Sequence, residues 1–272
     1  MMAMFCKALR KVKYLFFDID GTLAVGVPGQ EQYIPESTRE ALRRLREAGH
    51  FLSIATGRAH AMAVGYMREL GFENMVSDGG YGVTIGGRLK RLRPLDRAKC
   101  LALIDECAAK GLAWAVQADD SDTRLAPDGR FYELTRDTYM ATKTVPGLDA
   151  HSFPDINKIY IAARSDIELE CLSSLKTLPW CRYHDTYIFV EPADKAWGIR
   201  EMVAQTGGDT KDVIVFGDGV NDLSMFVPEW TSVAMGNAAE ALKRRATFIT
   251  ADAADGGIYK ACERLGLFER RN

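Results

Sequence analysis

The sequence lacks a long hydrophobic run, an excess of basic charge and any paired arrangement of cysteines. No stretch of its 272 residues approaches the ~18 consecutive apolar residues of a membrane-spanning helix, so we expect no membrane association. The formal net charge is -2, which argues against nucleic-acid binding, because proteins that bind nucleic acids usually carry a basic surface. Hydrophobic residues make up 47% of the chain and charged residues 26%, which is typical of a globular protein with a sizeable core.

The six cysteines show neither CxxC pairs nor a spacing typical of disulfides: Cys6, Cys100, Cys107, Cys171, Cys181 and Cys262. We therefore expect reduced, mostly buried thiols in a cytoplasmic protein, and no zinc site. No apolar run of ~7–15 residues follows the basic N-terminus, so we expect no signal peptide. Residues 119–129, DDSDTRLAPDG, lack the glycine and the glutamate that a calcium-binding loop of this type requires.

Short apolar runs alternate with helical patterns at both ends of the chain. Residues 12–17, 51–55 and 74–78 have the length and apolar character of buried strands, and amphipathic patterns between them predict helices. The same alternation resumes after residue 190. This order predicts an α/β fold in which a parallel sheet is built by right-handed crossovers and covered by helices in a Rossmann-like, three-layer arrangement.

The pattern changes in the middle of the chain, where glycines separate short alternating runs. Residues 78–92 predict hairpins, Asp128-Gly129 predicts a further hairpin turn, and residues 166–178 predict a helix. We interpret residues 82–186 as an inserted α+β unit that interrupts a core domain formed by residues 1–81 and 187–272. The aromatic residues of the insert are expected mainly in its core: Trp114, Tyr132, Tyr139, Tyr160 and Trp180.

Polar residues that could act in catalysis or ligand binding follow three of the predicted core strands. Ligands bind outside the carboxyl ends of the strands in open α/β sheets, so we expect these side chains to converge. The clusters are Asp18 and Asp20 after the first strand, Thr56, Gly57 and Arg58 after the second, and Asp218, Asn221 and Asp222 after the strand that follows the insert. Lys195 lies at the start of the helix that leads into that last strand.

Several carboxylates gathered in one place stay ionised only if a cation lies among them. Oxygen ligands from Asp18 and Asp218 suit Mg²⁺, which also binds substrate phosphate. Lys195 and Thr56, with the backbone N–H groups around Gly57, would then hold the phosphate. One carboxylate of the Asp18–Asp20 pair would attack phosphorus to form an aspartyl phosphate, and the other would protonate the leaving oxygen.

The motifs DIDGTL, ATGR, a DK pair before a helix, GDGVND and AMGNA resemble, in this order, those of the haloacid dehalogenase superfamily. The strongest resemblance is to the Cof-type phosphatases with a type-IIB cap, and it covers most of both halves of the core. It implies Asp18 as nucleophile and Asp20 as general acid and base. Thr56, Gly57, Lys195 and Asn221 would bind phosphate, and Asp218 would bind Mg²⁺ with Asp18 and the backbone carbonyl of Asp20. Asp222 would shape these surroundings, and Arg58 would either contact substrate or form a structural salt bridge.

One position departs from the family pattern: Asp78-Gly79 stands where the family usually has Asn-Gly. The resemblance implies a cytoplasmic, Mg²⁺-dependent phosphomonoester hydrolase that acts on a small phosphorylated metabolite, with a sugar phosphate favoured and the insert acting as a cap. We expect a monomer or a weak homodimer. Two other interpretations stay open: a phosphomutase of the phosphomannomutase type, and a metabolite-binding module with low turnover.

Overall fold

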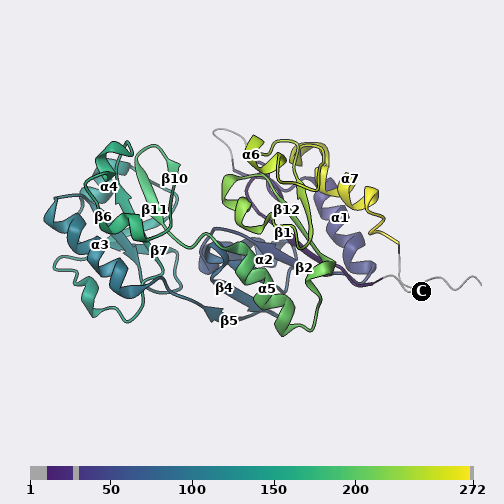
Figure 1. The fold of residues 1–272 in the computed structure, drawn as a ribbon, viewed down its shortest axis with the longest axis horizontal. Helices are drawn as coiled ribbons and strands as arrows, with labels where there is room; N and C mark the ends of the chain where they lie inside the picture. Colours follow the sequence, from purple (N-terminus) through teal and green to yellow (C-terminus); the bar gives the residue numbers. More distant parts are fainter. Residues whose placement is uncertain (1–10, 27–30, 270–272) are drawn as a thin grey trace, which may run out of the picture.

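The computed structural model describes residues 11–26 and 31–269, apart from the side chain of Tyr183. Two sheets with their covering helices make up these residues, as Figure 1 shows. The elements of the first sheet and its helices are β1 (Tyr14–Phe17), α1 (Glu36–Glu47), β2 (Phe51–Ala55), α2 (His60–Glu69), β3 (Met75–Ser77), β4 (Gly82–Ile85), β5 (Arg88–Leu92), α5 (Lys195–Gln205), β12 (Val213–Gly217), β13 (Thr231–Ala234), α6 (Glu240–Lys243), β14 (Phe248–Ile249) and α7 (Gly257–Arg264).

The first sheet has eight strands in the order β14-β13-β12-β1-β2-β3-β4-β5. The strands from β14 to β3 are parallel, and β4 and β5 extend the sheet as an antiparallel hairpin. From β1 the chain proceeds outward through β2 and β3, and after the insert it returns to the other side of β1 through β12. The strand order therefore reverses between β1 and β12, where open α/β sheets bind their ligands.

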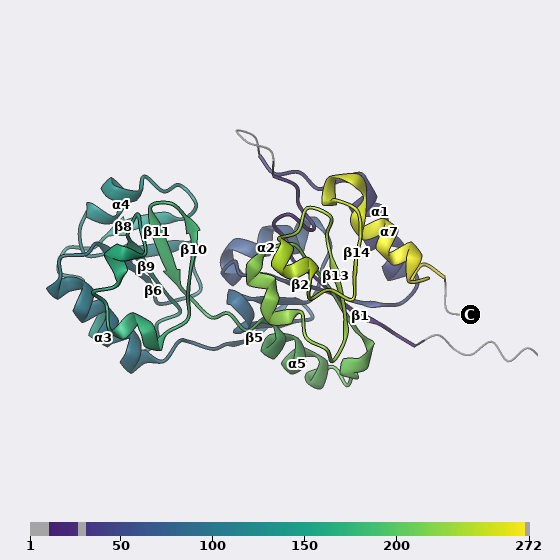
Figure 2. The same ribbon diagram turned by 45° about the horizontal axis from the view of Figure 1, so that its top comes forward.

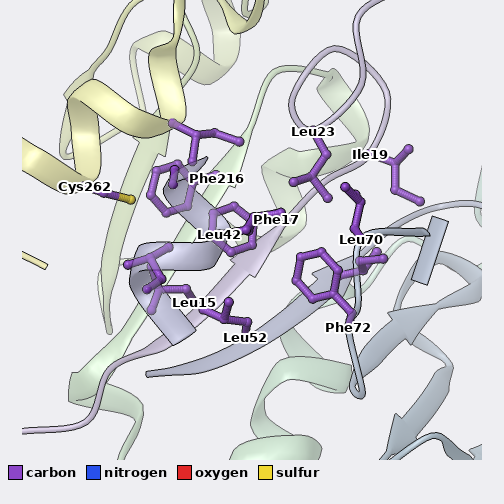
Figure 3. Packing of buried hydrophobic residues seen from close by; sticks show 14 of the residues in the cluster. Leu15, Phe17, Ile19, Leu23, Leu42, Leu52, Leu70, Phe72, Phe216 and Cys262 are labelled. Carbon is purple, nitrogen blue, oxygen red and sulfur yellow. The ribbon is translucent and has the colours of Figure 1, made fainter. Parts of the chain in front are cut away.

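Helices cover both faces of this sheet, because successive residues of its central strands point to opposite sides. Leu15 and Phe17 of β1 belong to the apolar cluster beneath α1 and α7, whereas Phe16 belongs to the cluster beneath α5. Figure 3 shows Leu15 and Phe17 among Leu42 of α1, Leu52 of β2 and other members of the first cluster. These residues confirm the expected α/β fold with a parallel sheet.

The second sheet has six strands in the order β10-β11-β9-β6-β7-β8. Its elements are α3 (Arg97–Ala109), β6 (Trp114–Gln117), β7 (Thr123–Ala126), α4 (Arg130–Thr135), β8 (Ala141–Thr144), β9 (Lys158–Ala162), β10 (Trp180–His184) and β11 (Tyr187–Val190). One face packs against α3, and the opposite face carries an aromatic cluster that includes Tyr160, Tyr187 and Phe189. Figures 1 and 2 show this unit, the cap, beside the larger sheet and joined to it by two chain connections.

The two sheets divide at different residues from those that the sequence suggested. The predicted insert began at residue 82, but β4 and β5 pair with the first sheet. The strands of the second sheet therefore all follow β5 in the sequence. The predicted insert ended at residue 186, but β11 lies inside the second sheet, between β10 and β9. The alternating pattern of a hairpin is the same whichever sheet it extends, and so the pattern could not assign β4 and β5.

Three local expectations also differ from the structure. Residues 166–178 form two short 3₁₀ turns, Ile167–Leu169 and Ser174–Thr177, in place of a helix. Asp128 and Gly129 lead into α4 and do not close a hairpin, since β7 pairs with β8 in parallel. The five described cysteines are free thiols, of which Cys171 is exposed, and Cys6 lies outside the described residues. Among the described helices, none combines the length and the hydropathy needed to cross a membrane.

Candidate active site

The two aspartate clusters meet at the reversal of strand order. Asp18 directly follows β1, and its backbone N–H donates to the carbonyl of Phe216 in β12 at 3.0 Å. Asp218 directly follows β12, which runs parallel to β1 with Phe17 opposite Phe216. The register of two adjacent parallel strands thus brings both carboxylates to the same end of the sheet, as expected.

The ammonium group of Lys195 donates hydrogen bonds to two of these carboxylates. Its side chain is 1% exposed, and Nζ donates to Asp18 Oδ1 at 2.7 Å and to Asp222 Oδ1 at 2.5 Å. Lys195 is the first residue of α5, and the side chain of Asp194 caps this helix by accepting from the Trp197 N–H at 3.0 Å. Burial would lower the pKa of Lys195, but the charges of Asp18 and Asp222 raise it above its usual value, so the ammonium stays charged.

The second carboxylate oxygen of Asp222 holds the loop that carries Asp218. Asp222 Oδ2 accepts from the backbone N–H of Asp218 at 2.9 Å and of Gly219 at 3.0 Å. Asp222 is fully buried, and Lys195 occupies its other oxygen. Both oxygens are therefore engaged, which suits a residue that positions the Asp218 loop.

Asp218 is held from its other side by the turn after β1. Thr22 Oγ1 donates to Asp218 Oδ1 at 2.9 Å. Gly21 has a φ of +79°, and a Cβ at this position would lie 2.1 Å from Asp218 Oδ2. Asn237, from the AMGNA segment, donates from Nδ2 to the Gly21 carbonyl at 2.9 Å. Only a glycine thus lets the turn pass this close to the carboxylate.

Asp20 lies on the more open side of the site, with 45% of its side chain exposed. Arg58 donates to it from both Nε at 2.9 Å and Nη2 at 2.7 Å, and Gln32 Nε2 donates at 2.8 Å. Partial burial opposes ionisation of Asp20, but the hydrogen bonds and charge of Arg58 outweigh it and lower the pKa of this carboxyl. Of the two roles expected for Arg58, the structure shows the salt bridge.

The loop after β2 carries the remaining cluster. Thr56 is buried, and its Oγ1 accepts from the backbone N–H of Arg58 at 3.1 Å, which leaves its hydroxyl proton available to a ligand. The carbonyl of Gly57 accepts from Nζ of Lys158 at 2.7 Å. Because Lys158 begins β9, this hydrogen bond ties the cap to the core beside the site.

The three clusters border one pocket of about 440 Å³ between the core and the cap. Its lining comprises Asp18, Asp20, Gln32, Thr56, Gly57, Arg58, Tyr139, His184, Phe189, Glu191, Gly219 and Asn221. Asn221 reaches the pocket from the 3₁₀ turn Val220–Met225 that follows β12. Lys195, Asp218 and Asp222 are not part of this lining, and Lys195 contacts the lining residue Asp18.

The carboxylates are crowded enough to hold a divalent cation. Asp18, Asp218 and Asp222 each offer an oxygen, and these oxygens lie within 4.8 Å of one another. Burial, with the nearby charge of Asp222, raises the pKa of Asp18 well above its usual value and that of Asp218 to about 7. Because Asp222 is already fully hydrogen-bonded, Asp18 and Asp218 are the carboxylates that suit a metal. A set of hard oxygen donors of this kind is compatible with a divalent metal ion.

Sequence reasoning missed the contributors from the cap and from its connection to the core. Tyr139, expected in the core of the insert, lines the pocket with His184 and Phe189. Trp114 and Tyr160 are buried as expected, whereas Tyr132 and Trp180 are 47% and 38% exposed. Glu191 and Lys158 form a buried pair at 2.5 Å. No local pattern marks these residues, because their positions depend on how the cap packs over the core.

Thr22 and Asn237 lie within the family motifs, but the motifs alone assigned them no role.

Asp78, which departs from the family pattern, is buried beside the site and does not line the pocket. It adopts a φ of +51° and accepts from the His60 N–H at 3.0 Å and from the Ser77 hydroxyl at 2.9 Å. Burial raises the pKa of Asp78, and Lys158 opposes that shift. This carboxyl therefore stabilises the loop after β3 and the start of α2.

Comparison with known proteins places these features in a family. The profile of the haloacid dehalogenase-like hydrolases matches residues 15–262. YkrA of Bacillus subtilis (strain 168), provisionally named a phosphatase, is 28% identical over 94% of this chain and 99% of its own length. A solved structure from Geobacillus kaustophilus HTA426, described as a hypothetical protein, is 35% identical over 94% of this chain and all of that one, with a TM-score of 0.82. The structure of BT4131, described as a subclass IIB sugar phosphatase, is 26% identical with the same coverage and a TM-score of 0.76.

Proposed function

This chain belongs to the haloacid dehalogenase-like hydrolases and is a phosphatase, and from that premise we propose that it is a Mg²⁺-dependent phosphomonoester hydrolase working through an aspartyl phosphate. The observation that carries the proposal is the position of Lys195, whose ammonium joins Asp18 to Asp222 while Asp218 lies across from them. The proposed substrate is a small phosphorylated metabolite, with a sugar phosphate favoured. The similarity to a sugar phosphatase supports that preference.

The metal-binding groups that we propose are the carboxylates of Asp18 and Asp218 and the backbone carbonyl of Asp20. Asp222 would hold the Asp218 loop without binding the metal, since its oxygens accept from two backbone N–H groups and Lys195. A bound Mg²⁺ would offset the charge of these carboxylates and of the phosphoryl group. The raised pKa values of Asp18 and Asp218 are consistent with this assignment, because burial and the nearby charge of Asp222 disfavour their ionised forms, which a cation would stabilise.

In the first proposed step, a carboxylate oxygen of Asp18 attacks phosphorus. A bond forms between that oxygen and phosphorus, the bond from phosphorus to the ester oxygen breaks, and Asp20 gives its proton to the departing alcohol. In the second step, water attacks phosphorus, Asp20 takes a proton from that water, and orthophosphate leaves as the carboxylate of Asp18 is restored. Lys195 holds Asp18 in place throughout and balances charge on the transferring group.

The phosphoryl group would be held by Thr56, Gly57, Lys195 and Asn221. Thr56 and Gly57 line the pocket, as does Asn221, which lies in the 3₁₀ turn after β12. Arg58 keeps Asp20 ionised by donating two hydrogen bonds to it. Since Asp20 must carry a proton to act as an acid, we propose that Arg58 turns toward the substrate when an anionic ester enters.

The cap would close over this site and exclude water while the leaving group is bound. Lining residues from both sides of the pocket support this role. We propose the cytoplasm as the location, where free thiols such as those of the five described cysteines persist.

The deciding experiment is phosphate release from a panel of phosphorylated sugars, nucleotides and cofactors, with Mg²⁺ or with EDTA, for the unmodified protein and for Asp18→Asn. We expect release only with Mg²⁺ and a loss of at least about 10³-fold in the variant, because the nucleophile is gone. No release from any ester in either protein would sink the proposal. An isomeric ester accumulating in place of orthophosphate would indicate a phosphomutase, and thermal stabilisation by an ester that is never cleaved would indicate a binding module.

A further inference from the structure

The pocket has a side that the proposed chemistry does not use. Asp18, Asp20 and Thr56 of the core line the part of the pocket where phosphate would bind, and a second wall belongs to the cap and its second connection. Tyr139, His184, Phe189 and Glu191 line that wall. We call these four residues the leaving-group wall, because the alcohol that departs from phosphorus would lie against them.

Glu191 is a buried acid that lines the pocket and has one oxygen strongly and one weakly engaged. Its side chain is 4% exposed, and Oε2 accepts from Lys158 Nζ at 2.5 Å. Among the described residues, the donor to Oε1 is the thiol of Cys181 at 3.7 Å, a weak hydrogen-bond donor at a long distance. Oε1 also lies near Gly57, 3.8 Å from where a Cβ would stand on that residue. A buried carboxylate oxygen with so weak a partner is costly unless a ligand donates to it.

The position of Glu191 is fixed by the cap. Lys158 is 2% exposed and divides its ammonium between Glu191 and the carbonyl of Gly57 at 2.7 Å. Lys158 and Glu191 therefore hold each other against the loop that carries Thr56. The carboxylate is thus held as a rigid hydrogen-bond acceptor at the pocket's edge.

The other three residues of the wall present rings. His184 stacks on Phe189 with ring centroids 5.8 Å apart, and Tyr139 meets Phe189 edge-on at 5.9 Å. Burial lowers the pKa of His184, so its ring is neutral near pH 7. Lys158 is already paired with Glu191, and Arg58 is paired with Asp20 until an anionic ester binds, when it would turn to the phosphoryl group. Among the described residues, the wall therefore offers aromatic surface, the polar groups of Tyr139 and His184 and one buried carboxylate, and no unpaired positive charge.

We propose that Glu191 selects the leaving group: it accepts a hydrogen bond from a hydroxyl or amino group on a ring-shaped, neutral or cationic alcohol, and it rejects alcohols that carry a carboxylate or a second phosphate. This inference rests on the proposed phosphatase function and specifies its substrate class. The rings of Tyr139, His184 and Phe189 cover the faces of the bound ring, and the carboxylate of Glu191 favours a neutral or cationic group over an anionic one. An anionic group beside this carboxylate would meet like charge in a buried site, which disfavours its binding.

The test uses four aryl phosphates of similar size: phenyl phosphate and its 4-hydroxymethyl, 4-aminomethyl and 4-carboxy derivatives. We expect kcat/KM to be at least about tenfold higher for the hydroxymethyl and aminomethyl esters than for the carboxy ester, with phenyl phosphate between them. In Glu191→Gln, the aminomethyl-to-carboxy ratio should fall by about tenfold or more, mainly through KM. Glu170→Gln, which changes an exposed acid of the cap, should leave the ratios unaltered.

Glu191→Asp is the second variant, because it keeps the charge opposite Lys158 and withdraws the oxygen by one methylene group. It should still reject the carboxy ester and should lose the advantage of the hydroxymethyl ester over phenyl phosphate. Thermal unfolding of each variant identifies any that fails to fold. Equal kcat/KM values for the four esters, or ratios that survive in Glu191→Gln, would overturn the inference while phenyl phosphate hydrolysis upholds the phosphatase. No hydrolysis of any ester would reject both.

Discussion

Asp222 shows how one buried side chain organises the catalytic groups around it. It fixes the backbone of the Asp218 loop with one oxygen and holds Lys195 with the other. In Asp222→Asn, an NH₂ group replaces one carboxylate oxygen and faces either the Lys195 ammonium or the backbone N–H groups, which are also donors. Lys195 also loses one of its two anionic partners. Removing a group that orients metal ligands typically costs about 10–100-fold in metal affinity or activity. We expect a loss of this size in kcat/KM and a higher Mg²⁺ requirement.

The measurement is phosphate release across a Mg²⁺ titration, with thermal unfolding recorded in parallel. Asp155→Asn is the control, because it removes one charge from an exposed residue of the cap. If Asp222→Asn retained full activity and an unaltered Mg²⁺ dependence, Asp222 would be a helix-capping residue alone.

Gly21 gives a second prediction, which separates backbone strain from a steric clash. In Gly21→Ala, the new Cβ would strike Asp218 Oδ2, since a separation of 2.1 Å is far below contact distance. Gly207 has a similar φ of +72°, but a Cβ there meets nothing within 4 Å. Both variants should lose about 1–2 kcal/mol from the left-handed backbone, and Gly21→Ala should also lose at least about tenfold in kcat/KM. Equal activity in the two variants would contradict the clash.

The sequence was most informative at the ends of the core strands. Asp18, Thr56 and Asp218 could be placed together because each follows a strand of one parallel sheet, and the carboxyl ends of such strands meet. Glu191 and Lys158 could not be found in this way. Their 33-residue separation has no periodic meaning, and their contact arises only when the cap sheet lies over the core.

At the scale of elements, the loop between β6 and β7 joins the cap to the start of α2. Asp120 Oδ2 pairs with His60 Nδ1 at 2.7 Å, and Asp120 Oδ1 accepts from the Ala61 N–H at 2.9 Å. A carboxylate at a helix N-terminus is stabilising, because it meets unpaired N–H groups and the positive end of the helix dipole. This loop, rejected above as a calcium site, thus contacts the core.

The pair predicts a pH dependence. Hydrogen bonding to Asp120 raises the pKa of His60 above 6.5, with Asp78 contributing through its charge, so this stabilisation is complete below pH 6.5 and is lost as the pH rises through the folded-state pKa. The hydrogen bond from His60 lowers the pKa of Asp120 below 3.8, so its contribution is complete above that pH and is lost on acidification. The pair should therefore stabilise most between about pH 4 and 6.5.

We expect His60→Gln to reduce the free energy of unfolding by about 1 kcal/mol near pH 6, with a smaller difference at pH 9. Thermal unfolding of both proteins from pH 4 to pH 9 measures this. His151→Gln is the control, because His151 pairs with Asp105 at the exposed surface of the cap and should alter stability less. A difference for His60→Gln that stays constant with pH would argue against the ion pair.

The limits of sequence reasoning at this scale appear in β4, β5 and β11. Strand type could be read from the alternation in residues 82–92 and from the apolar run of β11, but sheet membership could not, because neither pattern specifies which sheet a strand joins. The helix expected at residues 166–178 fails for another reason. Its apolar residues Leu169, Leu172 and Leu175 are buried in one cluster with residues of α3, and short 3₁₀ turns are enough to place them there.

At the scale of the whole molecule, the core and the cap have separate hydrophobic interiors. Two apolar clusters flank the eight-stranded sheet, and two others flank the cap sheet. Met62 of α2 packs against the aromatic cluster of the cap, and Lys158 and Asp120 add polar contacts to the core. Units with separate interiors are able to move and to unfold separately once the contacts between them weaken.

Lys158→Met tests how strongly the docked state depends on one buried charge. The variant leaves Glu191 buried without its cation and removes the hydrogen bond to Gly57, and breaking a buried pair in this way costs about 3–5 kcal/mol. Because the lost contacts join the cap to the core, we expect calorimetry to resolve two unfolding transitions, one for the cap and one for the core. Arg130→Gln, which breaks an exposed pair with Asp128 inside the cap, should cost less than about 1 kcal/mol and keep the number of transitions. A single transition at an unaltered temperature in Lys158→Met would mean that other contacts hold the cap closed.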